Sequence, residues 1–446
     1  MFPDPERIQI ILPVLSCIFL VLSFHRCIYG VIAYFIILNA KLGDMYPVLG
    51  AIRFELLAAV VVFASILQTR GFQNVLPKPD SLNKPLWIYF TLGMISVPLA
   101  VDIGTSWENG GYTLLKLMLF YIMVVSSIEN TSDLAKIVWA MILISGWIAY
   151  EPFYNFITGN IVLERYGEIA YGRFGAATGH VALANTLSQA VPIAFYWAIS
   201  QKGAFKTSTV YILLSLLVLG VVISKSRGGF VGLVAIAAGI TYQSKSRGKT
   251  AVILIACFFL LLPLAGTEYL NRISTITGGI SQSRSTSDRY EGLVHGISML
   301  IKRPLLGVGI GCYAEARRRF FHYYFYAHNL YGELFGELGI ASISWFVWIY
   351  MIFKKSNFLK TRLKSQDIET KRIYNLLCAV QVGLFTRLVI GNFSHCQLIW
   401  FWFFMAGITQ SIYNLTDVDI TLAPQETNGH SDSNSEKHAS STGLTI

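Results

Sequence analysis

Apolar segments long enough to cross a membrane make up most of this chain. A transmembrane helix needs about 20 mostly apolar residues, and short polar or glycine-containing breaks separate segments of roughly that length between residues 8 and 413. Two of the thirteen segments, 27–40 and 228–242, are short, so we expect 12–13 transmembrane helices. The candidate spans are 8–24, 27–40, 46–68, 85–103, 110–128, 133–157, 181–199, 207–223, 228–242, 250–266, 328–353, 374–391 and 396–413.

The composition agrees with this interpretation and excludes several classes of soluble protein. The chain is 54% hydrophobic and 13% charged, whereas roughly 25% of residues in an ordinary globular protein are charged. We therefore predict an all-α polytopic membrane protein, with an integral membrane domain over residues 1–413. The net charge of +10 does not indicate a nucleic-acid partner, because the basic residues lie in loops between apolar segments. The six cysteines form no CxxC or Cys/His pattern, which indicates neither a disulfide scaffold nor a zinc site. We expect no metal and no cofactor.

The basic loops predict the orientation of the chain. Loop 354–372 contains seven Lys and Arg residues, and loops 243–249 and 70–84 contain three each. If the chain crosses the membrane with each predicted span, these loops lie on the same side. We expect this side to be the cytoplasm, because Lys and Arg concentrate in cytoplasmic loops. The polar tail 414–446 falls on the same side, and its few apolar residues predict disorder.

A long loop, 267–327, is predicted on the opposite side, and it is also basic. Its eight Lys and Arg residues stand against four acidic residues. Long loops can translocate whatever their charge, but the positive charge also suits an anionic ligand on the outer face.

Within this loop, segment 287–303 has the apolar spacing of an amphipathic helix. Asp288 and Glu291 stand three residues apart, as at a capping box, and this start would put Arg289 in the first helical turn. A helix N-terminus with an added guanidinium is a good phosphate site. An exposed arginine that pairs with Glu291 or a lipid headgroup explains Arg289 equally well.

Two further segments place polar groups at the ends of apolar runs. Residues 224–229 break two apolar runs and carry Arg227, which taken alone is more typical of an ordinary turn with an interfacial arginine. The entry of span 328–353 carries His328, a residue able to accept a proton near neutral pH. Glu337 lies deeper in that span, where a carboxylate is usually functional or paired. Asn329, Tyr331 and Glu333 crowd the same entrance.

The order of these motifs resembles the O-antigen ligase family, which includes related polymerases and protein O-oligosaccharyltransferases. The resemblance covers roughly residues 224–340, and it implies a bundle like that of the C-type membrane glycosyltransferases with one long periplasmic loop. Its motifs, in chain order, are Ser226-Arg227-Gly228-Gly229, Asp288-Arg289-Tyr290, Arg303-Pro304-Leu305-Leu306-Gly307-Val308-Gly309 and His328-Asn329-Leu330-Tyr331 with Glu333, Glu337, Leu338 and Gly339.

The resemblance implies a transferase of the bacterial inner membrane that works at the periplasmic face. Its donor would be a glycan on a polyprenyl (undecaprenyl) pyrophosphate carrier, and its acceptor a hydroxyl of a lipid A core, a glycan or a protein, in lipopolysaccharide or other surface polysaccharide biosynthesis. Arg227 and Arg289 would bind the pyrophosphate without a metal, and His328 would activate or orient the acceptor. Further substrate contacts are expected from Asn329, Tyr331, Arg303 and Glu337.

Three other functions compete with this hypothesis. A transporter or flippase of lipid-linked envelope precursors would show internal repeats and polar groups at the midplane of the membrane, whereas polarity here gathers at one face. A peptidoglycan polymerase of the shape-and-division type would need an acidic catalytic residue, which has no clear counterpart in loop 267–327. A structural or sensory membrane protein would explain the composition but not the loop.

Overall fold

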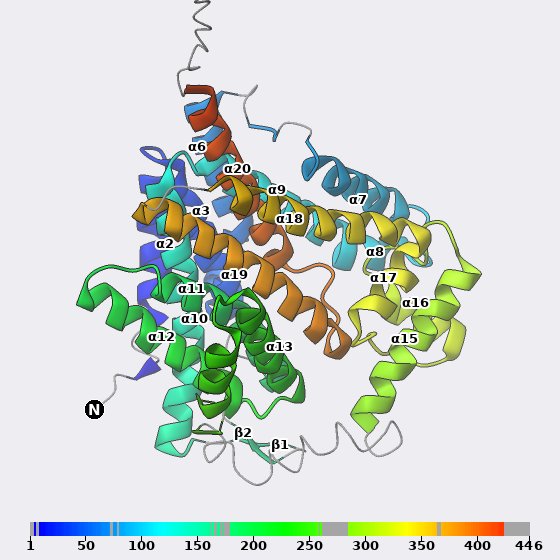
Figure 1. Ribbon diagram of the computed structural model, residues 1–446. Coiled ribbons are helices and arrows are strands. Elements are labelled where there is room, and N and C mark those ends of the chain that lie inside the picture. Colours follow the sequence, from blue (N-terminus) through cyan, green and yellow to red (C-terminus); the bar gives the residue numbers. More distant parts are fainter. Residues whose placement is uncertain are drawn as a thin grey trace, which may run out of the picture.

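Helices form nearly all of the part of the chain that the structure, a computed structural model, describes (Figure 1). The described residues are 4–5, 9–71, 75–77, 80–160, 162–164, 167–169, 172, 179–257, 259–260, 284–363 and 367–422. The helices are α2 Ile11–Leu22, α3 Cys27–Ala40, α4 Leu42–Met45, α5 Pro47–Ala51, α6 Phe54–Arg70, α7 Asn83–Ser96, α8 Ile103–Ser106, α9 Tyr112–Ser127, α10 Thr131–Thr158, α11 His180–Ala198, α12 Ala204–Ile223, α13 Arg227–Gln243, α15 Arg284–Lys302, α16 Tyr313–Phe321, α17 Leu330–Leu338, α18 Ile343–Arg362, α19 Ile368–Ile390 and α20 Trp400–Leu422.

The predicted all-α polytopic membrane fold is confirmed. Among the described residues, five helical stretches are long and apolar enough to cross a bilayer, while other apolar helices such as α2 and α3 are shorter. The expected number of 12–13 spans therefore stays a prediction. The five stretches are Ile103–Ser127, Thr131–Thr158, Ala204–Ile223, Leu330–Arg362 and Ile368–Phe393.

Several predicted spans are interrupted in the structure. Segment 46–68 divides into α5 and α6 because Arg53 takes a left-handed conformation with φ 50°. Segment 328–353 divides into α17 and α18 at Gly339, whose φ is 59°. Mostly apolar sequence flanks both breaks, so a hydropathy pattern does not reveal them.

Some predicted boundaries change, and some fall outside the described residues. The helix α20 continues to Leu422, past the predicted end of the last span at 413 and into the segment predicted as a disordered tail. A short antiparallel hairpin of β1 (Val162–Glu164) and β2 (Gly167–Ile169) occupies part of the predicted loop 158–180. Residues 261–283, which end span 250–266 and begin loop 267–327, lie outside the described residues, as does the tail from 423 onward.

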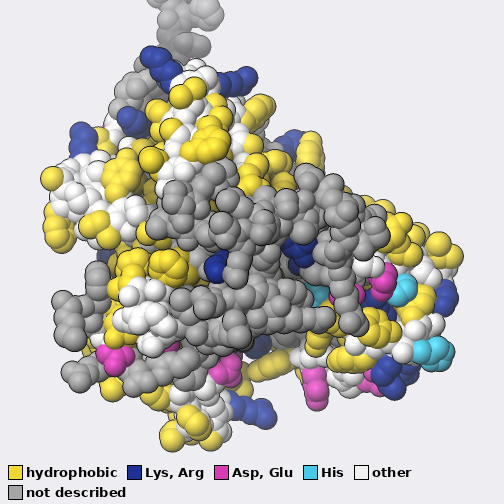
Figure 2. Space-filling model, turned by 90° about the horizontal axis from the view of Figure 1, so that it is seen from below, with side chains coloured by type: hydrophobic (Ala, Val, Ile, Leu, Met, Phe, Trp, Pro, Cys, Tyr) yellow, Lys and Arg dark blue, Asp and Glu magenta, His cyan; other side chains and the backbone are white. Residues whose placement is uncertain are grey.

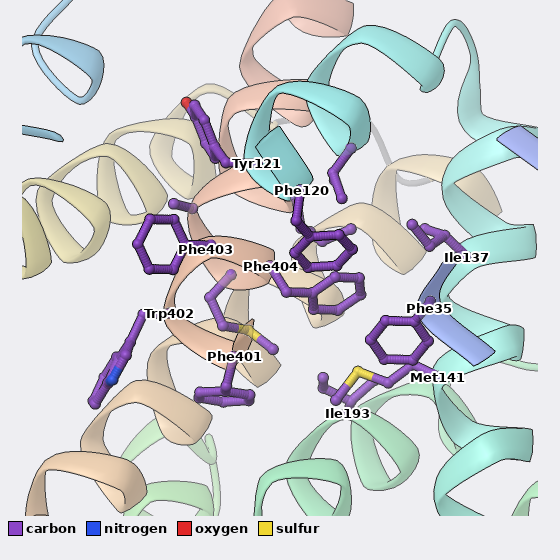
Figure 3. Packing of buried hydrophobic residues seen from close by; sticks show 14 of the residues in the cluster. Phe35, Phe120, Tyr121, Ile137, Met141, Ile193, Phe401, Trp402, Phe403 and Phe404 are labelled. Carbon is purple, nitrogen blue, oxygen red and sulfur yellow. The ribbon is translucent and has the colours of Figure 1, made fainter. Parts of the chain in front are cut away.

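An aromatic cluster forms the centre of the helical bundle (Figure 3). Phe404 of α20 stacks on Phe35 of α3 and Phe120 of α9, with ring centroids 5.5 Å and 6.4 Å away. Phe35 also meets the edge of Trp400 at 4.9 Å. All of these rings except that of Trp400 are fully buried or nearly so, and each aromatic pair contributes about 0.5–1.5 kcal/mol beyond the area it buries. Helices from both ends of the sequence therefore join in one core.

Helices α15, α16 and α17 pack together at one side of the bundle (Figure 1). The α15 and α17 backbones touch because glycines face each other along the contact. A Cβ atom at Gly292 would collide with the carbonyl oxygen of Ala327, and one at Gly296 with that of Gly332. Small residues four positions apart permit this close approach of two helices. Gly332 and Gly336 of α17 are also four positions apart, and Tyr313 of α16 packs against Gly336.

We expect Gly296→Ala to destabilise the contact between α15 and α17. The added methyl group would overlap the Gly332 carbonyl, and overpacking of this kind costs about 1–3 kcal/mol. The measurement is the Tm of the detergent-purified protein. The matched control is Gly248→Ala, because nothing lies within 4 Å of a Cβ atom at that position; a similar fall in Tm in both variants would contradict the prediction.

Candidate functional site

Arg227 is the first residue of α13, directly after a strained turn. Lys225 has a φ of 50°, and the Ser226 hydroxyl caps the helix by accepting a hydrogen bond from the Gly229 backbone nitrogen at 3.3 Å. A Cβ atom at Gly228 would lie 3.2 Å from the Cβ atom of Phe393. The turn therefore holds the start of α13, and with it Arg227, against residue 393.

Arg289 lies in the second turn of α15 and faces the same phenylalanine. Its guanidinium carbon is 5.4 Å from the centre of the Phe393 ring, a cation–π contact. The helix predicted over about 287–303 corresponds to α15, but α15 begins at Arg284, so Asp288 lies inside the helix and does not cap it. The helix N-terminal N–H groups are thus a full turn away, and any anion at Arg289 would bind the guanidinium rather than the helix end.

His328 sits immediately before the cap of α17 in a conformation that few residues adopt. Its φ is 45°, and Asn329 accepts hydrogen bonds from the backbone nitrogens of Tyr331 and Gly332, both at 3.0 Å. Left-handed backbone of this kind is uncommon outside glycine and is often found at functional sites. The cap and the strained residue together fix the direction of the imidazole.

The surroundings of His328 keep its imidazole neutral. Burial lowers the pKa of His328 below its ordinary value, and the positive charges of Arg289 and Arg317 lower it further. Its ring centroid is 4.9 Å from that of Phe325 and 5.0 Å from that of His395. A neutral imidazole can accept a proton from a hydroxyl group.

His395 is a second histidine at the site, in the connection 391–397 between α19 and α20. Burial, together with the positive charge of Arg387, lowers its pKa to about 4. Its ring stacks on Tyr326 at 5.0 Å. The connection is tied to α17, because Oε2 of Glu333 accepts hydrogen bonds from the backbone nitrogens of Cys396 and Gln397, at 2.8 Å and 3.1 Å.

The structure brings some of the predicted site residues together and separates others. Asn329 adjoins His328, and the Tyr331 hydroxyl donates to the carbonyl oxygen of Leu388 at 2.9 Å. Arg303 follows the opposite end of α15, about 21 Å along the helix from Arg289, and donates to the carbonyl oxygen of Leu99 at 3.0 Å.

Glu337, buried in α17, binds three donors of this chain. Its carboxylate accepts from the backbone nitrogens of Gly311 and Tyr313, at 2.7 Å and 3.1 Å, and from the Gln397 side chain at 2.6 Å. A buried carboxylate needs such partners. Glu337 therefore fixes the glycine-rich connection 304–311, whose Gly307, Gly309 and Gly311 all have positive φ.

Part of the positive charge of the long loop is used within the protein. Arg318 and Arg319 both bind Glu315, and Arg319 also reaches Asp102 at 2.7 Å. Arg317 is completely buried and binds Glu291 at 3.0 Å. These pairs account for three of the loop's arginines without an external anion.

Residues 212–361 match the model of a protein family described as O-antigen ligase. This segment belongs to the O-antigen ligase family. It runs from α12 into α18 and contains Arg227, Arg289 and His328. A search for similar curated proteins found no match. The match supports a membrane glycosyltransferase of the O-antigen ligase or polymerase type, a class that acts on a lipid-linked glycan donor and an acceptor.

The O-antigen ligase segment does not include every residue around His328. Phe393 and His395 lie beyond it, and neither was predicted from the sequence as a site residue. A signal for them exists: residues 391–397 form a polar interruption between the apolar spans 374–391 and 396–413, comparable to the break at 224–229. In the sequence, Arg317 is only one of the basic residues of loop 267–327, and nothing indicates that it is buried.

We expect His328→Asn and His328→Ala both to lose glycan transfer, but to differ in stability. Asn tolerates left-handed backbone better than Ala, for which this conformation costs on the order of 1–2 kcal/mol. The Asn variant should therefore have the higher Tm, measured in detergent beside a transfer assay.

His322 provides the matched control, since its φ of 57° is also left-handed. His322→Ala should lower Tm in the same way and keep transfer. Retained transfer in His328→Asn would contradict a chemical role for the imidazole.

Proposed function

We propose that this protein transfers a glycan from a polyprenyl pyrophosphate carrier to an acceptor hydroxyl at the periplasmic face of the bacterial inner membrane. The product would belong to lipopolysaccharide or another surface polysaccharide. The convergence of Arg227, Arg289 and His328 around the 391–397 connection is the observation that carries the proposal. Three separate helices, α13, α15 and α17, deliver these residues to one place.

Arg227 and Arg289 suit the pyrophosphate of the donor. The start of α13 packs against Phe393, and the Arg289 guanidinium lies 5.4 Å from the same ring. A guanidinium group can donate two parallel hydrogen bonds to the oxygens of one phosphate, and it keeps its charge at any physiological pH. Two such groups can stabilise the charge that develops on the departing pyrophosphate.

His328 suits the role of general base in the transfer step. The acceptor oxygen forms a bond to the anomeric carbon of the donor sugar while the bond between that carbon and the pyrophosphate oxygen breaks. The acceptor proton passes to His328, and the electron pair leaves on the polyprenyl pyrophosphate. The lowered pKa of His328 leaves its imidazole neutral before the reaction, as a base requires.

We expect cells that lack this gene to accumulate polyprenyl-pyrophosphate-linked glycan on the periplasmic face. Wild-type protein should remove the accumulation, whereas Arg289→Ala and His328→Ala, at equal abundance, should not. The measurement is the amount of carrier-linked glycan on each face of the membrane.

Arg318→Gln is the control for Arg289, because Arg318 is an exposed arginine of the same loop and its partner Glu315 keeps a second ion pair with Arg319. It should behave as wild type. Accumulation confined to the cytoplasmic face would instead support a flippase, and relief by both site variants would contradict the proposed roles.

We expect kcat/KM for transfer to fall as the pH is lowered, with the midpoint of this fall below pH 6.5. The pKa of His328 is lowered in the free protein, and activity is lost as pH falls through that pKa because the imidazole gains a proton. A bound pyrophosphate offsets the charge of Arg289, so the midpoint for kcat should lie at a higher pH. Coincident midpoints above pH 6.5 would contradict this assignment.

A further inference from the structure

A cleft lies beside the proposed transfer site, between α15 and the chain that follows α16. Its volume is about 530 Å³. Figure 2 shows acidic, basic and histidine side chains gathered at the side of the molecule where α15 and α16 lie. The cleft is lined by Ser287, Asp288, Glu291, His295, Phe321 and Tyr323.

The cleft uses a different face of α15 from the one that carries Arg289. Ser287, Glu291 and His295 follow at intervals of four residues and therefore lie in one row along the helix. Because successive residues are turned by about 100°, Arg289 points almost opposite to that row. Between the two lies the glycine face that packs on α17. α15 thus presents Arg289 on one flank and Glu291 on the other.

The wall of the cleft is aromatic and well supported. The His295 ring stacks on Phe321 with centroids 4.0 Å apart. Tyr323 lies over the guanidinium of Arg317 at 4.9 Å. Arg317, which is completely buried, also binds Glu291 at 3.0 Å and so connects the aromatic wall to the acidic row.

This combination of groups matches the surface of a sugar ring. Aromatic faces pack against the apolar C–H face of a pyranose, and carboxylates accept hydrogen bonds from its hydroxyls. The Ser287 hydroxyl and the imidazole of His295 add further polar partners. An anionic ligand fits poorly, because Asp288 and Glu291 both line the cleft.

Side-chain contacts connect the cleft to His328. Tyr323 touches Arg317, whose guanidinium carbon is 5.8 Å from the Phe325 ring. Phe325 in turn contacts His328 at 4.9 Å. The cleft wall is therefore in contact with His328 through Arg317 and Phe325.

We propose that the cleft between α15 and residues 321–323 binds a pyranose unit of the saccharide that is being transferred or extended. This inference rests on the proposed function and assigns Tyr323 and Asp288 to substrate recognition.

The test compares two carriers that share the pyrophosphate and differ in the glycan. Full-length protein in detergent is titrated with polyprenyl pyrophosphate alone and with polyprenyl-pyrophosphate-linked glycan purified from cells that lack the gene. Tyr323→Ala should weaken binding of the glycan-bearing carrier about tenfold and leave binding of the bare carrier unchanged. Asp288→Asn, which keeps the shape of the side chain, should show the same selectivity with a smaller loss.

Tyr324→Ala is the matched control. Tyr324 is the next residue, and with 52% exposure against 40% for Tyr323 it is at least as accessible, but it does not line the cleft. It should bind both carriers as wild type does. Equal weakening by Tyr323→Ala and Tyr324→Ala would overturn the inference.

The same variants distinguish the source of the sugar. If the saccharide in the cleft belongs to the acceptor, Tyr323→Ala should raise the KM for a saccharide acceptor about tenfold and leave donor binding unchanged. If the variant weakens only the binding of the donor, the saccharide in the cleft belongs to the donor glycan. No effect on either substrate overturns the inference while the proposed function stands. If wild-type protein binds the bare carrier and performs no transfer, the proposed function itself fails.

Discussion

Gly292 and Gly296 of α15 lie against Ala327 and Gly332 with no side chain between the two backbones. This contact decides where each flank of α15 points. It turns Arg289 toward Phe393 and the row of Ser287, Glu291 and His295 toward the cleft. Because the two backbones touch directly, α15 cannot rotate without moving α17, which begins two residues after His328. The proposed anion site, base and sugar cleft therefore depend on a single helix contact.

Aromatic rings separate the positive groups of the site. Arg289 lies over Phe393, and Arg317 lies over Tyr323 and near Phe325. A ring face attracts a cation without neutralising its charge, and Arg317 is in addition paired with Glu291. The same charges lower the pKa of His328. Cation–π contacts in this way allow the fold to keep cations next to a neutral histidine.

Much of the fold follows from hydropathy, while the site depends on features that hydropathy does not record. The matching of α3 to span 27–40 and of α12 to span 207–223 reflects long apolar runs. The breaks at Arg53 and Gly339 depend on positive φ within apolar sequence, and the start of α15 at Arg284 lies before the motif that resembled a capping box. The order of Arg227, Arg289 and His328 was visible in sequence. The 391–397 connection beside which they lie follows His328 by more than sixty positions, and no sequence pattern links it to them.

The hydrogen bonds of Glu333 and Glu337 have a consequence for how this protein can be recombined with its relatives. They attach Cys396 and Gln397 to α17, although the O-antigen ligase segment ends at residue 361. A chimera that exchanged only residues 212–361 would give these carboxylates a foreign 391–397 connection and would mismatch the surroundings of His328. The exchangeable unit is therefore discontinuous in sequence, and α19 with the connection to α20 travels with it.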